Sequence, residues 1–276
     1  MRSAIIYFYI CSAVIITDGN CMANPDTLIT SGHSHNDYQQ IRPLWEALEK
    51  KFISIEVDIH LSGRALLVGH DPEDLKSENT LQSMYLEPLR AYITGHNSWV
   101  YPGRELILFI DIKTAADSTY KILREILKEY AGMLTVYSAE QVKKGAVAVV
   151  ISGNRPRQLM SREKTRYATY DGRLTDLNGD LPPNFIRLIS DNWENYFSWR
   201  GKEPISAEEH KKLAEIIAAA HAKDCMIRFW GLPVSDPSCR RRVWTELLSA
   251  GVDLISVDDL KAYKDFQMEK NYEPKK

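Results

Sequence analysis

The chain has 276 residues, of which 44% are hydrophobic and 26% charged, values that are typical of a soluble globular protein. Its formal net charge of −2 supplies no overall basic field, so we expect no nucleic-acid partner. The length suits one large domain, and α/β barrels commonly have this size. Because no linker, repeat or low-complexity segment divides the sequence, we expect a single domain.

Residues 1–23 have the pattern of an export signal. The mostly apolar run 4–16 is too short to span a bilayer comfortably and has the length of a signal-peptide core. We therefore expect cleavage after Ala23, a mature domain of residues 24–276, and export to the periplasm or the exterior. Lipidation at Cys21 is a weaker alternative, because the residues just before it are not all small, and a retained anchor is weaker still.

Strand-like and helix-like patterns alternate from Leu28 onward. Strands are predicted at residues 28–34, 52–61, 105–114, 146–151, 167–170, 186–190, 226–231 and 254–257, and helices at 43–51, 80–93, 117–134, 206–223 and 240–250. Eight strands that alternate with helices favour a parallel sheet, and such a sheet closes most naturally as a single (β/α)8 TIM barrel.

Two cysteines, Cys225 and Cys239, remain in the expected mature chain. The predicted strand 226–231 and a loop separate them, and a strand of that length spans about 15–20 Å. Because a disulfide cannot bridge such a distance, we expect two free thiols.

The second predicted strand carries the first candidate functional residues. Side chains alternate between the two faces of a strand, so Glu56, Asp58 and His60 share one face, and aliphatic residues occupy the other. His70 and Asp71 follow after a short turn and a second apolar run. Paired carboxylates repel unless a cation lies between them, which favours a site for Mg²⁺ or Ca²⁺. The alternative is a solvated strand face.

The third predicted strand ends with Asp111 and Lys113 on one face. Since neighbouring parallel strands lie about 4.8 Å apart, Asp111 can complete a metal site with Glu56 and Asp58. Lys113, one pleat further out, can face an anionic substrate. The alternative is an internal Asp–Lys pair at the end of the strand.

The order of these motifs resembles the phospholipase C-like phosphodiesterase superfamily, which includes glycerophosphodiester phosphodiesterases, bacterial phosphatidylinositol-specific phospholipases C and sphingomyelinase D-type enzymes. Within it, the chain looks most like the altered inheritance of mitochondria protein 6 group, through Ser34-His35-Asn36-Asp37-Tyr38. The resemblance covers nearly the whole mature chain, and its further motifs are Glu56-x-Asp58, His70-Asp71, Asp111-x-Lys113, Arg228-x-Trp230 and Gly251-Val252-Asp253.

The resemblance implies roles for five of these residues in metal binding and catalysis. Glu56, Asp58 and Asp111 would bind one Mg²⁺ or Ca²⁺ ion, and His35 and His70 would be the acid/base pair. This set suits phosphodiester cleavage, which needs stabilisation of charge on the phosphate oxygens together with a base and an acid. The sequence does not assign base and acid between the two histidines.

His33 and His35 point the same way from the first strand, so either could fill the first histidine role. The match to the His-Asn-Asp-Tyr motif favours His35. His60 has no matching role and is interpreted as a hydrogen-bonding histidine.

The resemblance also implies substrate contacts. Lys113 would contact phosphate, and Asn36 and Trp230 would bind the substrate. The chain departs from glycerophosphodiesterases at Asn36-Asp37, where those enzymes have Arg-Gly, so it lacks their arginine contact to phosphate. We therefore expect a monomeric, metal-dependent phosphoric diester hydrolase acting on a phospholipid or phospholipid-derived diester, with peripheral membrane contact.

Two other classes of function remain open. A retaining glycosidase needs two carboxyl groups, commonly from the fourth and seventh strand ends, but those ends are Ser152-Gly153-Asn154 and Arg228-Phe229-Trp230. A non-catalytic binding barrel would explain the aromatic stretch 193–199 but not the gathering of histidines and carboxylates at strand ends. That stretch is interpreted either as a lid or as loop packing.

Overall fold

The strand β2 (Phe52–Ser62) shows how the alternating sequence builds the fold. Its aliphatic side chains, such as Ile55 and Val57, are fully buried in the main hydrophobic core together with side chains of the surrounding helices. Its polar side chains, such as Glu56 and Asp58, are also buried, and by alternation they face the opposite side. A strand with both faces covered is typical of a closed parallel sheet.

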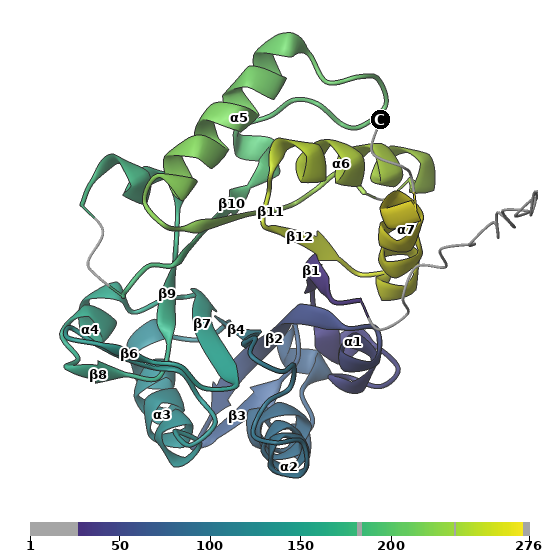
Figure 1. Cartoon of the computed structure of the whole chain (residues 1–276). Coiled ribbons are helices and arrows are strands. Elements are labelled where there is room, and N and C mark those ends of the chain that lie inside the picture. The colour runs from purple at the N-terminus through teal and green to yellow at the C-terminus, as the bar shows by residue number, and fades with distance from the viewer. Residues whose placement is uncertain (1–26, 181–183, 235, 273–276) are drawn as a thin grey trace, which may run out of the picture.

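The computed structural model describes residues 27–180, 184–234 and 236–272, and eight of their strands close into a parallel barrel (Figure 1). The barrel strands, in order around the ring, are β1 (Ile29–Ser34), β2, β4 (Leu106–Ile112), β7 (Val147–Gly153), β9 (Thr169–Gly172), β10 (Leu188–Asn192), β11 (Met226–Trp230) and β12 (Leu254–Val257). Pairing of β1 with both β12 and β2 closes the ring. The predicted TIM barrel is therefore confirmed.

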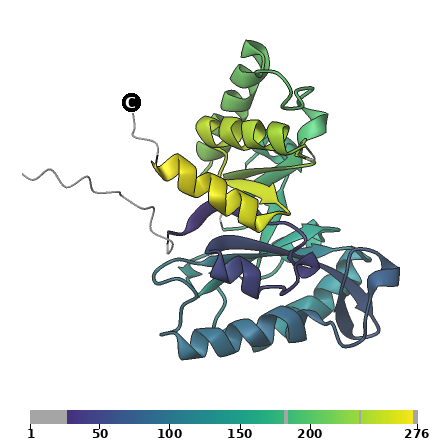
Figure 2. The ribbon, with the colours of Figure 1, turned by 90° about the vertical axis from the view of Figure 1, so that its right-hand side faces the viewer.

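Helices surround the barrel, and α2 and α3 lie on the side opposite α5 and α6 (Figures 1 and 2). The α-helices are α1 (Trp45–Glu49), α2 (Glu87–Gly95), α3 (Ala116–Glu129), α4 (Arg157–Ser161), α5 (Ala207–His221), α6 (Pro237–Ala250) and α7 (Leu260–Tyr272). A π-helical turn, Gln82–Leu86, leads into α2, and short 3₁₀ turns lie at Asp37–Gln39, Pro72–Asp74, Leu174–Asn178 and Trp193–Asn195. No described helix has the length and apolarity needed to cross a membrane.

Four short strands lie outside the ring. β3 (Ala65–Val68) pairs antiparallel with β2 and so returns the chain along its outer edge. β5 (Val136–Ser138) pairs antiparallel with both β6 (Val142–Lys143) and β8 (Thr165–Arg166), which forms a small separate sheet. None of these strands was predicted as part of the barrel, and the segment just after β3 carries His70.

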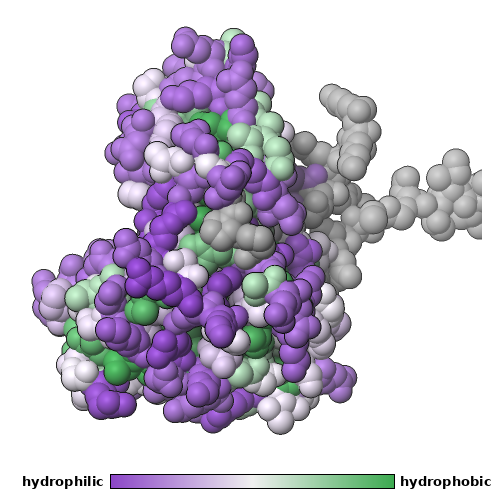
Figure 3. Space-filling view, turned by 90° about the vertical axis from the view of Figure 1, so that its left-hand side faces the viewer, coloured by the Kyte–Doolittle hydropathy of each residue, from purple (hydrophilic) through white to green (hydrophobic). Residues whose placement is uncertain are grey.

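The core has two parts. The larger lies between the barrel and the helices, and the smaller fills the barrel with Ile107, Phe109, Val150, Leu188 and Leu254. The face in Figure 3 is mostly hydrophilic, with separate small hydrophobic areas.

Several local predictions can now be compared with the structure. Cys225 and Cys239 are both free and buried, which confirms two free thiols. The aromatic stretch after β10 packs inward: Trp193 stacks on Phe197 with ring centroids 4.0 Å apart, and both are buried. It is therefore loop packing and not a lid. Helix α7 was not predicted. The predicted export signal, residues 1–23, lies outside the described residues.

Candidate active site

Three carboxylates meet inside the barrel at the ends of β2 and β4. These strands pair in parallel with Asp58 opposite Asp111, so the register makes the two side chains neighbours. Glu56 precedes Asp58 by two residues and therefore lies on the same face. One oxygen from each of the three carboxylates lies within 4.8 Å of the others. We call Glu56, Asp58 and Asp111 the carboxylate cluster.

Glu56 is held in place by two buried partners. Its Oε2 accepts hydrogen bonds from Nε2 of His33 at 2.6 Å and from the Arg228 guanidinium at 2.7 Å. Burial alone would raise the pKa of Glu56, but the charge of Arg228 and the His33 hydrogen bond outweigh it and hold this pKa well below its usual range. Glu56 therefore stays ionised although it is buried.

His33 is fully buried and is absent from the lining of the cavity described below. Burial, together with the charge of Arg228, lowers the pKa of His33 to about 3, so this ring is neutral near pH 7. Since the Glu56 carboxylate only accepts, Nε2 of His33 donates to it, and Nδ1 accepts from Ser54 Oγ at 2.7 Å. Both ring nitrogens are therefore used in support of Glu56.

Asp58 joins the cluster to three polar side chains through its Oδ2 atom. This oxygen accepts hydrogen bonds from Tyr38 Oη at 2.8 Å and His70 Nδ1 at 2.9 Å, and it lies 3.0 Å from Lys113 Nζ. The same ammonium group lies 3.1 Å from Oδ1 of Asp111. Burial alone would lower the pKa of Lys113, but the two carboxylates outweigh it and raise this pKa.

The second oxygen of each carboxylate has no protein partner among the described residues. Within the described residues, the hydrogen bonds and ion pairs of the cluster use only Oε2 of Glu56, Oδ2 of Asp58 and Oδ1 of Asp111. Oδ1 of Asp58 is buried without a hydrogen-bond partner, which is costly unless a cation or water satisfies it. Burial raises the pKa of Asp111. The negative charges of Glu56 and Asp58 raise this pKa further, and the positive charge of Lys113 opposes them. These hard oxygen donors fit one Mg²⁺ or Ca²⁺ ion.

His35 follows β1 and reaches the same end of the barrel. Its Nδ1 lies 2.8 Å from Oδ1 of Asp258, which follows β12, and its backbone N–H donates to Val257 at 3.1 Å. Burial alone would lower the pKa of His35, but the Asp258 hydrogen bond and the Glu56 charge outweigh it and raise this pKa. The Asp258 contact orients the ring and leaves Nε2 as its second functional nitrogen.

The turn that carries His35 is fixed by a buried carboxylate. Asp37 accepts hydrogen bonds from Ser34 Oγ at 2.7 Å, from the Leu44 backbone N–H at 2.5 Å and from Tyr85 Oη at 3.0 Å. These bonds tie the turn to the segments before α1 and before α2. The turn itself requires a left-handed backbone at Asn36, with φ of 47°. Asparagine tolerates this conformation better than most residues.

His70 lies on the segment after β3 and lines the same cavity as His35. Because a carboxylate oxygen accepts, Nδ1–H of His70 donates to Asp58, and no described residue bonds to Nε2. The imidazole of His60 lies 3.0 Å from the His70 carbonyl oxygen and thus steadies this segment. His60 is a hydrogen-bonding residue, as interpreted from the sequence.

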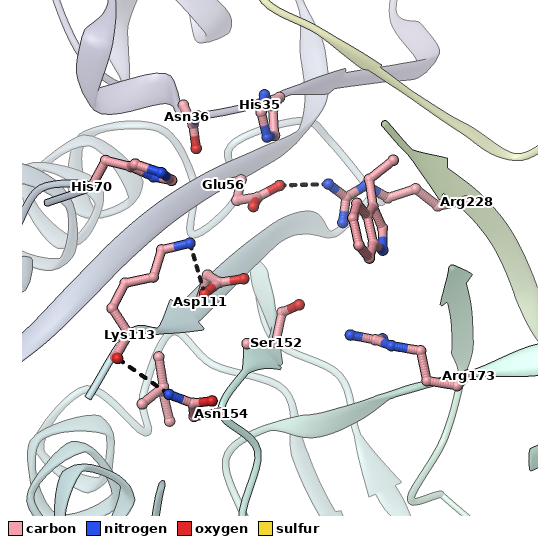
Figure 4. Close-up of a pocket in the computed structure, with 13 residues that line it drawn as sticks. His35, Asn36, Glu56, His70, Asp111, Lys113, Ser152, Asn154, Arg173 and Arg228 are labelled. Atoms are coloured by element: carbon pink, nitrogen blue, oxygen red, sulfur yellow. Dashed lines mark hydrogen bonds and ion pairs between the residues drawn. The ribbon is translucent and has the colours of Figure 1, made fainter. Parts of the chain in front are cut away.

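These side chains surround a cavity of about 450 Å³ at the barrel mouth (Figure 4). It is lined by residues from six barrel strands and their loops: His35, Asn36, Glu56, His70, Asp111, Ile112, Lys113, Ser152, Gly153, Asn154, Arg173, Arg228 and Trp230. Seven of the eight candidate site residues line it, and the eighth, Asp58, lies beneath His70 and Lys113 as their shared partner.

Gly153 lies directly against the cluster and gives a first testable prediction. Its φ is +67°, and an added Cβ would lie 2.2 Å from Asp111 Oδ1 and 2.6 Å from the Ile112 carbonyl oxygen. Gly153→Ala should therefore displace Asp111 and destabilise the fold. Gly103→Ala is the matched control, because φ there is +72° and nothing lies within 4 Å. Denaturant unfolding should show Gly153→Ala to be the less stable variant by about 1–3 kcal/mol. Equal effects would contradict the close approach.

Two lining or supporting residues were missed by sequence reasoning. Asp258 was not identified as the partner of His35, because strand patterns do not show which side chains of the loops after β1 and β12 touch. Arg173 was not noted at all, because the fifth strand was predicted to end at Tyr170. The strand continues to Gly172, and the alternation of Asp171 with Arg173 was the signal that could have identified it.

Comparisons with known proteins place this site in a family. The chain is 30% identical to "Altered inheritance of mitochondria protein 6" of Eremothecium gossypii, over 87% of this chain and 70% of that protein. It is 29% identical to "Altered inheritance of mitochondria protein 6 homolog" of Arthroderma benhamiae, over 92% of this chain and 90% of that protein. A solved structure of Thermotoga maritima Cel5A with mannotriose aligns with 12% identity and a TM-score of 0.43, over 83% and 89% of the two chains, a likeness too low to support any conclusion.

The predicted export of the protein is contradicted by these relatives. Both are named for altered inheritance of mitochondria, which points to a mitochondrial role and not to a periplasmic or secreted one. The prediction rested on the apolar run 4–16. Apolar runs of this length also occur in buried core helices and interfacial segments, so the run does not establish export by itself.

The family model described as "AIM6-like phosphodiesterase domain" matches residues 23–171, which is more than half of the chain. The matched region includes His35, His70 and the whole carboxylate cluster. The predicted resemblance is confirmed, and the chain belongs to the family of AIM6-like phosphodiesterase domains.

Proposed function

We propose that this phosphodiesterase-family chain is a metal-dependent phosphoric diester hydrolase that acts on a phospholipid or phospholipid-derived diester. The observation that carries the proposal is the meeting of two histidines, a lysine and the carboxylate cluster around one cavity. Each group corresponds to a need of the reaction: a base, an acid, and stabilisation of charge on the phosphate.

In this proposal Glu56, Asp58 and Asp111 hold one Mg²⁺ or Ca²⁺ ion through the oxygens that the protein leaves unused. Such an ion, when bound, stabilises negative charge on the non-bridging phosphate oxygens. The buried, unpartnered Oδ1 of Asp58 is the strongest support. The cluster carries three negative charges against the two positive charges of Lys113 and Arg228, and this balance favours a further cation.

The proton transfers are assigned to the two histidines. His70 donates through Nδ1 to Asp58, so the lone pair on Nε2 is available to remove a proton from the attacking hydroxyl group. The raised pKa of His35 favours its protonated form, which suits donation of a proton to the leaving alkoxide. Lys113 and Asn36, which line the same cavity, are the proposed phosphate and substrate contacts.

The lipid-derived substrate class rests on Trp230. Its side chain lines the cavity and its residue is 36% exposed, which is unusual for so large an apolar group. We infer that it covers the glycerol or acyl portion of the substrate. The cavity volume of about 450 Å³ accommodates a headgroup and glycerol but not a whole diacyl lipid.

A panel of diesters tests the proposed function. The purified protein should hydrolyse at least one member of a panel of lysophospholipids, glycerophosphodiesters and inositol phosphodiesters, lose that activity with a chelator, and regain it with Mg²⁺ or Ca²⁺. Product analysis identifies which P–O bond is broken. Turnover that survives the chelator would reject the metal, and no turnover on the whole panel would favour the binding-barrel alternative.

A further inference from the structure

Arg173 lies on the side of the cavity away from the histidines. It directly follows β9, and Figure 4 shows its guanidinium pointing from that strand into the cavity, on the far side of Ser152. Its side chain is 25% exposed. The mechanism proposed above gives it no role.

A buried network fixes the orientation of Arg173. Asp171, which is fully buried, accepts hydrogen bonds from Arg173 Nη1 at 2.9 Å, from Ser152 Oγ at 2.9 Å and from Ser190 Oγ at 2.6 Å. The same Nη1 also donates to the Gly172 carbonyl at 3.0 Å. The guanidinium is therefore held by one nitrogen, which reduces the entropy lost when it binds a ligand.

The other edge of this guanidinium is available. Within the described part of the chain, every side-chain hydrogen bond of Arg173 is made by Nη1. The remaining edge carries Nε and Nη2, whose parallel N–H groups match the two oxygens of a carboxylate or phosphate group.

The two other cationic side chains of the cavity, Arg228 and Lys113, are already paired with the carboxylate cluster. Arg228 donates to Glu56 at 2.7 Å and to Ser256 Oγ at 3.0 Å, and its side chain is only 3% exposed. Lys113 lies between Asp58 and Asp111. Of these three, Arg173 is the cation that presents an open donor edge to the cavity.

The sheet order separates Arg173 from the reacting phosphate. β7 lies between β4 and β9, so two strand spacings of about 4.8 Å each lie between the strand of Asp111 and the strand that leads to Arg173. A phosphate positioned over the cluster would therefore lie about two strand spacings from Arg173, a separation that a neighbouring substituent of a small headgroup can span.

We propose that Arg173 recognises a second oxyanion on the substrate headgroup, so that the preferred substrates are phosphodiesters whose headgroup carries a carboxylate or phosphate group. This inference rests on the proposed function and narrows its substrate class. The open Nε–Nη2 edge of Arg173 and the buried Asp171 carboxylate that holds its Nη1 together form the recognition site.

Two substrates that differ by one carboxylate test the inference. Glycerophosphoserine and glycerophosphoethanolamine share the scissile phosphate and the ammonium group. The wild-type protein should prefer the serine ester, and Arg173→Gln should reduce the ratio of the two kcat/KM values by about 10- to 100-fold, the range of a charge-assisted hydrogen bond. Arg173→Lys keeps the positive charge but not the paired N–H donors, so it should reduce this ratio less than Arg173→Gln does. Arg241→Gln, at an exposed surface ion pair, should leave the ratio unchanged.

The outcomes separate the inference from the proposed function. Equal losses of kcat/KM on both substrates would overturn the inference, because Arg173 would then contact the scissile phosphate or only support the fold. A wild-type preference for glycerophosphoethanolamine would also overturn the inference and would favour cation binding at Trp230. Calorimetry with phosphoserine and phosphoethanolamine needs no turnover. Tighter binding of phosphoserine that Arg173→Gln removes would support the recognition site even if hydrolysis is never observed, and equal binding would reject it.

Discussion

Replacement of His70 by alanine should lower kcat for phosphodiester hydrolysis by about 10²–10⁴-fold, the usual cost of losing one proton-transfer group. Metal binding should survive, because the Asp58 oxygen that His70 contacts is not the oxygen left for the ion. Calorimetric titration with Mg²⁺ or Ca²⁺ and steady-state kinetics measure the two effects separately. Asp58→Asn should instead weaken metal affinity, because it removes charge from the cluster.

His35→Ala should cause a similar loss on natural substrates but a much smaller one on a diester with an activated leaving group, which needs little general acid. A general acid must be protonated, so the rate should fall as pH rises above the raised pKa of His35. His210→Ala is the control, because His210 is an exposed histidine paired with Glu246. Near-wild-type kcat for both His35→Ala and His70→Ala on both kinds of substrate would disprove the assignment.

Arg228→Ala should destabilise the fold by about 3–5 kcal/mol, because it leaves the buried carboxylate of Glu56 without its cation. Arg42→Ala is the matched control, because Arg42 pairs with Glu49 on the surface and more than half of each side chain is exposed. That variant should unfold at nearly the wild-type denaturant concentration. Chemical denaturation at neutral pH measures the stability of both variants.

The pH dependence of the stability difference between Arg228→Ala and the wild-type protein tests whether the lost ion pair causes it. In the wild-type protein the pKa of Glu56 is lowered, so the ion pair stabilises the fold above the usual glutamate pKa of 4.5 and less as pH falls. The gap between Arg228→Ala and wild type should therefore shrink on acidification. A gap that does not change with pH would indicate lost packing, for example against Phe109, whose ring centroid lies 5.1 Å from the guanidinium carbon.

Much of the site could be predicted because strand alternation is a local property. The faces of Glu56, Asp58 and Asp111 follow from counting residues along a strand, and the ends of parallel strands meet at one rim. The barrel itself follows from the alternation of strands with helices, which tertiary packing did not override. These inferences need no knowledge of which side chains touch.

The remaining features depend on contacts between distant segments. His33 on β1 and His35 just after it have the same parity, and only the three-dimensional structure shows that His33 is enclosed by Glu56 and Ser54 while His35 reaches the cavity. Asp258 meets His35 across 223 positions of sequence. Arg173 was missed for a different reason, since the weak pattern of β9 allowed an error of two residues at the end of the strand.

The register of β2, β4 and β7 constrains how this protein can change during evolution. Asp58 lies opposite Asp111, and Asp111 lies opposite Ser152, in consecutive steps of the ladder. Insertion of one residue into β4 before Asp111 would turn that carboxylate out of the barrel and the neighbouring aliphatic side chains into it. Loops at the barrel mouth can gain or lose residues and alter the substrate, but lineages that keep this cluster should show no length variation within these strands.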